Sequence, residues 1–165
     1  MSVSSDMIAM WHKPMVTIRR QFAAGPHEGR ALALLLSGCF LVFVGRLPIL
    51  QRGAIMAGEG GDLFRDVSYA FAGMVLIAPL LFYGIAALAG LLARLFRLRP
   101  TGFGARLAMF WAYLSAAPAG LLYGLALGFN GPSIAVSIVG AIWLFAFLIF
   151  WTLGLRVAGQ ETSHA

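Results

Sequence analysis

Ionisable side chains are scarce in this sequence of 165 residues, where Asp, Glu, Lys and Arg together make up 11% and hydrophobic residues 61%. The mean hydropathy is +0.88. A soluble domain is about half apolar and one quarter charged, so the composition indicates an integral membrane protein. From Leu107 to Leu155 the chain contains no Asp, Glu, Lys, Arg or His. At ~1.5 Å per helical residue, that run can cross a ~30 Å hydrocarbon core about twice.

Histidine is absent from every apolar stretch, because His12, His27 and His164 all lie near the ends of the chain. The apolar stretches contain no carboxylate either. A haem ligand, the base of an intramembrane serine protease, a proton relay and a metal-dependent hydrolase all need such groups. We therefore expect no catalytic residue, no cofactor site and no metal site, and we expect that the protein is not an enzyme.

Cysteine and acidic residues are also rare. Cysteine occurs once, at Cys39, so no disulfide can form within one chain. A small packing residue is the first interpretation of Cys39, and a reactive or lipidated thiol is the alternative. The only cluster of carboxylates comprises Glu59, Asp62 and Asp66. A divalent-cation site is one interpretation of it, but we favour another, in which Asp62 caps the next helix and Asp66 lies in its first turn.

The apolar runs predict an all-α fold, a polytopic membrane helical bundle with four transmembrane helices. The expected spans are about residues 31–50, 67–93, 107–129 and 134–155. The turn-forming residues 130–133 separate the last two spans. We expect a mobile, glycine-rich loop from Gln51 to Asp66, a basic connection from Arg94 to Arg106, and a polar tail of residues 156–165 that is too short to fold alone.

Residues 1–30 are expected to form an amphipathic segment at the membrane interface. Read as a helix, the segment has apolar residues at every third or fourth position, and Pro14 divides it into two short helices. The side chains expected at the interface are Trp11, Ile18, Phe22, Arg19 and Arg20. A partner-binding face and a removable transit peptide are the alternatives. A secretory signal peptide is not expected, because the charged region before the first apolar run is too long.

Lys and Arg are distributed unequally between the two sides of the predicted bundle. The side of both termini has nine: Lys13, Arg19, Arg20, Arg30, Arg94, Arg97, Arg99, Arg106 and Arg156; the opposite side has Arg46, Arg52 and Arg65. The positive-inside rule predicts that both termini are cytoplasmic. Basic residues at the ends of spans also suit anionic lipid, so the net charge of +6 indicates no nucleic-acid partner. Arg46 is expected to reach the membrane boundary, with an intramembrane function as the alternative.

One face of the third span carries a small residue at every fourth position. These residues are Ala108, Ala112, Ala116, Gly120, Gly124 and Gly128. Small residues let helix backbones approach closely in lipid, so they predict a packing face for another helix of this chain or for a second protomer. Pro79 and Pro118 each remove a helical hydrogen bond and are expected to kink their spans. A Tyr-Gly pair follows each proline, by coincidence or, alternatively, through an inverted repeat.

Several short motifs are spread over nearly the whole chain: Trp11, Pro14, Arg19-Arg20, Gly25-Pro26, Arg30-Ala31-Leu32-Ala33, Ala78-Pro79-Leu80-Leu81-Phe82-Tyr83-Gly84, Ala93-Arg94-Leu95-Phe96, Ala105-Arg106-Leu107-Ala108 and Phe110-Trp111. Together they resemble the small bacterial members of the YIP1 family. The resemblance implies a multi-span protein of the bacterial inner membrane with no assigned role. Eukaryotic members of this family engage Rab-type GTPases and usually have five spans and a longer cytosolic N-terminus. The four spans expected here argue against binding of a small GTPase.

Three classes of function are compatible with these features. The leading hypothesis is a non-enzymatic inner-membrane protein of YIP1 type, embedded in the lipid bilayer, that acts as a scaffold or as an accessory subunit of a homo-oligomer or larger complex. The alternative is a small transporter or channel for a neutral or lipid-like solute, built on the kinked spans and Arg46. A third class is a lipid-organising protein whose residues 1–30 sense anionic membrane.

Overall fold

The structure is a computed structural model that describes residues 3–58, 61–95, 98 and 100–161. Its elements are α1 (Val3–His12), α2 (Pro14–Ala23), α3 (Glu28–Ala57), α4 (Leu63–Phe71), the π-helical segment η2 (Ala72–Ile77), α5 (Ala78–Leu95), α6 (Gly102–Asn130) and α7 (Ile134–Glu161). The described part of the chain contains no β-strand. The all-α fold class predicted from the sequence is therefore confirmed.

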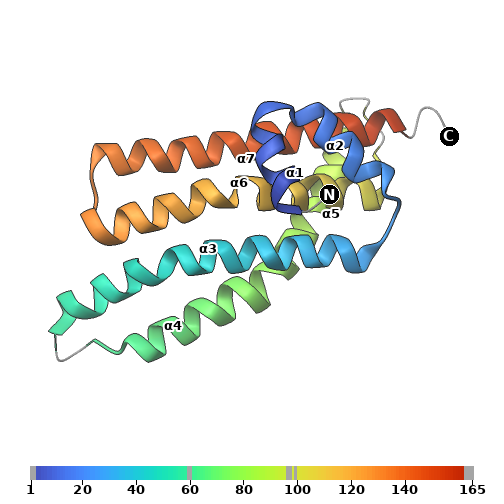
Figure 1. The fold of residues 1–165 in the computed structure, drawn as a ribbon. Helices are drawn as coiled ribbons and strands as arrows, with labels where there is room; N and C mark the ends of the chain where they lie inside the picture. The colour runs from blue at the N-terminus through green and yellow to red at the C-terminus, as the bar shows by residue number, and fades with distance from the viewer. Residues whose placement is uncertain (1–2, 59–60, 96–97, 99, 162–165) are drawn as a thin grey trace.

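Four helical segments are long and apolar enough to cross a membrane. They are Glu28–Ala57, Leu63–Leu95, Gly102–Asn130 and Ile134–Gln160, and the second of them joins α4, η2 and α5 end to end. Figure 1 shows the long helices side by side, with α1 and α2 packed toward the end of the bundle where the C-terminus lies. The protein is thus a multi-pass membrane protein.

The spans are longer than the sequence predicted, because contacts with neighbouring helices hold their extra turns. α3 continues through Pro48 to Ala57, and α4 starts at Leu63, so most of the expected loop is helical. Arg52 anchors the extension of α3 by donating to the carbonyls of Gly128 and Phe129 at the end of α6. At the other end, α7 continues through Arg156 to Glu161.

The end of α7 is held by burial of small apolar residues. Val157 and Ala158 are 2% and 3% exposed. Ala158 Cβ lies 3.1 Å from the position that a Cβ on Gly104 of α6 would occupy. The first residues of the expected polar tail therefore form part of the helical bundle.

The core of the bundle is α6. Every residue from Leu107 to Ala117 is buried, and the most extensive interfaces of the molecule are those of α6 with α3 and with α7. The second span is divided between two neighbours: α4 and η2 pack against α3, whereas α5 packs mainly against α6. η2 lies directly before the turn that contains Pro79, where the missing amide N–H disturbs regular α-helical bonding.

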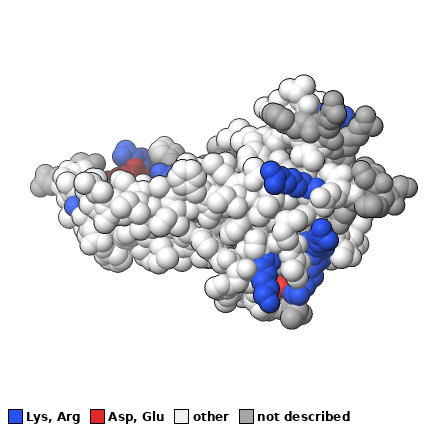
Figure 2. All heavy atoms as spheres, turned by 90° about the horizontal axis from the view of Figure 1, so that it is seen from above, with Lys and Arg blue, Asp and Glu red and all other residues white. Residues whose placement is uncertain are grey.

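Charged residues lie at the two ends of the bundle. Figure 2 shows several Lys and Arg side chains around one end, a small mixed group at the other, and a long uncharged surface between them. Arg106 forms an ion pair with Glu28 at the end that carries α1 and α2. The predicted basic residues Arg97 and Arg99 lie outside the described residues, as do Glu59 and His164.

Candidate functional site

The six small residues predicted to form a packing face lie on α6, and all six are buried in the structure. They are named the α6 ridge. A Cβ on Gly124 would lie 2.1 Å from the carbonyl oxygen of Gly45 in α3. A Cβ on Gly128 would lie 2.4 Å from Pro48 Cβ, and one on Gly120 would lie 2.8 Å from the indole ring of Trp143 in α7. The ridge therefore packs against α3 and α7 of the same chain.

The two prolines are accommodated differently. Pro118 lies inside α6, which continues past it to Asn130. The carbonyl of Ser115, less than one turn earlier, accepts a hydrogen bond of 3.1 Å from the indole N–H of Trp11. Pro79 is the second residue of α5 and is buried, directly after the π-helical segment. Pro118 frees the carbonyl of Leu114, not that of Ser115, so the Trp11 bond is an additional contact to α6 close to the proline.

Part of the apolar face of residues 1–30 packs against the bundle, and its location at the membrane interface stays a prediction. Ile18 and Phe22 are 1% and 9% exposed and belong to the core formed with α6 and α7. The ring of Trp11 meets Phe150 of α7 edge to face, with centroids 5.4 Å apart. The reason is that α6 and α7 present apolar surface at this end, and the stripe covers it. Arg19 and Arg20 remain exposed.

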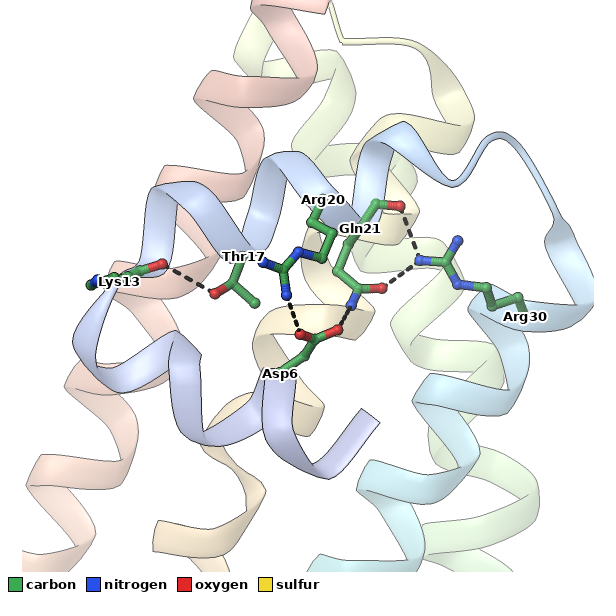
Figure 3. A network of polar contacts seen from close by, with 6 residues as sticks. All are labelled: Asp6, Lys13, Thr17, Arg20, Gln21 and Arg30. Carbon is green, nitrogen blue, oxygen red and sulfur yellow. Dashed lines mark hydrogen bonds and ion pairs between the residues drawn. The ribbon is translucent and has the colours of Figure 1, made fainter. Parts of the chain in front are cut away.

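A polar network joins α1, α2 and the start of α3 (Figure 3). The carboxylate of Asp6 accepts hydrogen bonds from Arg20 at 2.9 Å and from the side-chain amide of Gln21 at 3.1 Å. Arg30 donates to the backbone and side-chain oxygens of Gln21. Asp6 is only 7% exposed, so these donors compensate a charge that burial would otherwise make costly. The sequence analysis did not predict this network. The available signal was that Asp6 is the single acidic residue among residues 1–27, which also contain Arg20 and Gln21.

Two open hollows follow one another along the side of α7 that faces α5, and together they are named the groove. Its first part has a volume of about 580 Å³, and its lining includes Phe82 of α5, Tyr113 of α6, and Ala141 and Phe147 of α7. Its second part has a volume of about 560 Å³. It is lined on one side by Ala89, Leu92, Ala93 and Leu98, and on the other by Leu148, Trp151, Thr152, Leu155 and Arg156. The groove is apolar and rich in aromatic rings. Trp151, in its second part, has a buried indole N–H without a hydrogen-bond partner in the structure.

Asp62 and Asp66, near the loop between the first two spans, have different roles. Asp62 accepts a hydrogen bond of 3.0 Å from the backbone N–H of Arg65, which confirms the predicted cap. Asp66 forms a surface ion pair with Arg65 at 3.5 Å. Within the part of the chain that the structure describes, no three His, Cys, Asp or Glu residues gather in a way that could hold a metal ion. Cys39 is a buried packing residue of α3.

No family model, no curated protein and no solved structure matches this chain. The resemblance to the YIP1 family therefore stays a prediction. Function has to be inferred from the residues and their arrangement.

Proposed function

We propose that the protein is a non-enzymatic scaffold or interaction subunit of the bacterial inner membrane, with both termini in the cytoplasm, and that the groove between α5 and α7 receives a transmembrane helix of a partner. The groove is the observation that carries this proposal. The small-residue ridge of α6 is covered by α3 and α7, so association with a partner has to use another surface.

The dimensions of the groove suit a helix that crosses the membrane. Its lining on α7 extends from Ser137 to Arg156, which is ~28 Å at 1.5 Å per residue and close to the ~30 Å of the hydrocarbon core. In lipid, helices associate through close packing and interhelical hydrogen bonds. The aromatic walls of the groove provide surface for close packing. The unpartnered indole N–H of Trp151 can donate an interhelical hydrogen bond.

Filling the groove tests the proposal. Ala141 lines it, and its neighbour Ile142 is exposed but absent from the lining, so Ala141→Trp and Ile142→Trp are a matched pair. After extraction into polymer nanodiscs with native lipid, the wild type and Ile142→Trp should have the mass of a complex larger than one chain. Ala141→Trp should have the mass of one chain.

Two results would contradict the proposal. One is a wild-type particle that contains a single chain only, and the other is an equal loss of the complex in both variants. Solute flux in liposomes made with the purified wild type, abolished by Ala141→Trp, would instead favour the small transporter.

A further inference from the structure

Another hollow lies along the part of α6 that contains Gly120 and Leu127, and it does not depend on the proposed function. Its volume is about 270 Å³, and it lies between α3, η2, α6 and α7. The residues that carry the inference are Arg46, Met74, Gly120, Tyr123 and Trp143. Met74 belongs to the π-helical segment η2, and such segments are frequent at functional sites.

Arg46 brings a positive charge to this hollow from within a membrane span. It precedes Arg52 by six residues, or ~9 Å along α3, and Arg52 marks the end of α6 by donating to its last carbonyls. In the described part of the chain, no hydrogen bond or ion pair holds the guanidinium of Arg46. Arg46 is exposed, and an arginine within a membrane span is costly unless a counter-charge or water reaches it.

Trp143 supplies a second donor without an acceptor. Its indole nitrogen is buried and has no hydrogen-bond partner. It lies 3.0 Å from the position that a Cβ on Gly120 would occupy, so only glycine at 120 lets the ring lie there. Gly45, next to Arg46, lies against the same stretch of α6. Arg46 of α3 and Trp143 of α7 thus line the same hollow. The nearby carboxylates of the sequence, Asp62 and Asp66, belong to the cap and the first turn of α4.

We propose that this hollow binds the anionic phosphate group of an amphiphile, with the Arg46 guanidinium and the Trp143 indole N–H as its donors. A guanidinium donates two parallel hydrogen bonds to a phosphate and is more weakly hydrated than an ammonium, which suits it to a membrane-embedded phosphate. Tyr123 and Trp143 also line the aromatic groove along α7. An apolar tail attached to the phosphate can therefore lie against these two rings.

Lipid titration of the purified, delipidated protein, followed by native mass spectrometry, tests the site. The probe is phosphatidylglycerol, and diacylglycerol with the same acyl chains is the control without phosphate. We expect Arg46→Gln to weaken phosphatidylglycerol binding about tenfold, Arg46→Lys to weaken it less, and Trp143→Phe to weaken it about threefold. Arg65→Gln, which removes an exposed cation of α4, should leave binding unchanged.

The variants are compared only where their thermal unfolding by circular dichroism matches that of the wild type. If Arg46→Gln does not fold, Arg46→Lys replaces it, because lysine keeps the charge but cannot donate two parallel hydrogen bonds. Excess inorganic phosphate separates the sources of the ligand: displacement of the lipid identifies a site for free phosphate, and no displacement identifies a lipid headgroup. Unchanged binding by Arg46→Gln, or an equal loss in Arg65→Gln, would overturn the proposal, because Arg46 then only reaches the membrane boundary.

Discussion

Replacement of Gly124 by alanine tests how the two most extensively packed spans are held together. The new Cβ would lie 2.1 Å from the carbonyl oxygen of Gly45 and 2.5 Å from its carbonyl carbon. Both are backbone atoms, so no side chain can rotate to make room. Because ordinary contacts begin at 3.4 Å, α3 and α6 must separate locally by about 1.3 Å.

The expected cost follows from that separation. An extra methylene in a packed core costs ~1–3 kcal/mol. Separation of the helices by 0.5–1 Å additionally removes about a quarter to a half of each dispersion contact along the seam. Alanine recovers only ~1 kcal/mol through its higher helix propensity. We therefore expect Gly124→Ala to lower the free energy of unfolding by about 3 kcal/mol or more.

The measurement is reversible unfolding in mixed micelles at rising dodecyl sulfate fraction, followed by tryptophan fluorescence. Gly84→Ala is the matched control, because Gly84 lies within α5 and a Cβ there meets no atom within 4 Å. It should be neutral or stabilising by up to ~1 kcal/mol. If Gly124→Ala is as stable as Gly84→Ala, the close contact between α3 and α6 does not stabilise the fold, and the reasoning is wrong.

Three further substitutions probe the N-terminal helices and the second span. Trp11→Phe removes the donor to the Ser115 carbonyl and should cost about 1 kcal/mol, seen as faster tryptic cleavage of α2. Asp6→Asn removes the charge that Arg20 and Gln21 compensate and should cost about 1–2 kcal/mol in the same unfolding assay, since Arg20 keeps contact with solvent. Asp62→Ala removes the cap of α4 and should cost ~1 kcal/mol, detected as faster hydrogen exchange in the first turn of that helix.

The positions of the spans could be predicted from the sequence, but their ends could not. Apolar runs are a local signal, and all four of them are spans in the structure. The ends depend on distant residues: α3 is extended because Arg52 binds carbonyls of α6, and α7 is extended because Val157 and Ala158 are buried. Likewise, the ridge through Gly124 was visible in the sequence, whereas the identity of its partner helix was not.

The candidate sites were harder to predict for the same reason. An apolar stripe in residues 1–30 has the same spacing whether it covers lipid or protein, and only the exposed apolar surface of α6 and α7 decides between them. The sequence placed Arg46 at the end of a span but gave no sign that Trp143 lines the same hollow. The close approach of Gly45 of α3 and Trp143 of α7 to α6 depends on the glycines of α6.

The most extensive packing of α3 is with α6, and this has a consequence for synthesis of the protein in the membrane. Residues 58–101, including the whole second span, are translated before α6 emerges from the ribosome. Until then, Gly45 of α3 lacks its contact with Gly124 of α6, and the first two spans share only a small interface. A chain released after Leu95 should therefore be degraded quickly in a pulse-chase experiment, and addition of residues up to Asn130 should prolong its lifetime.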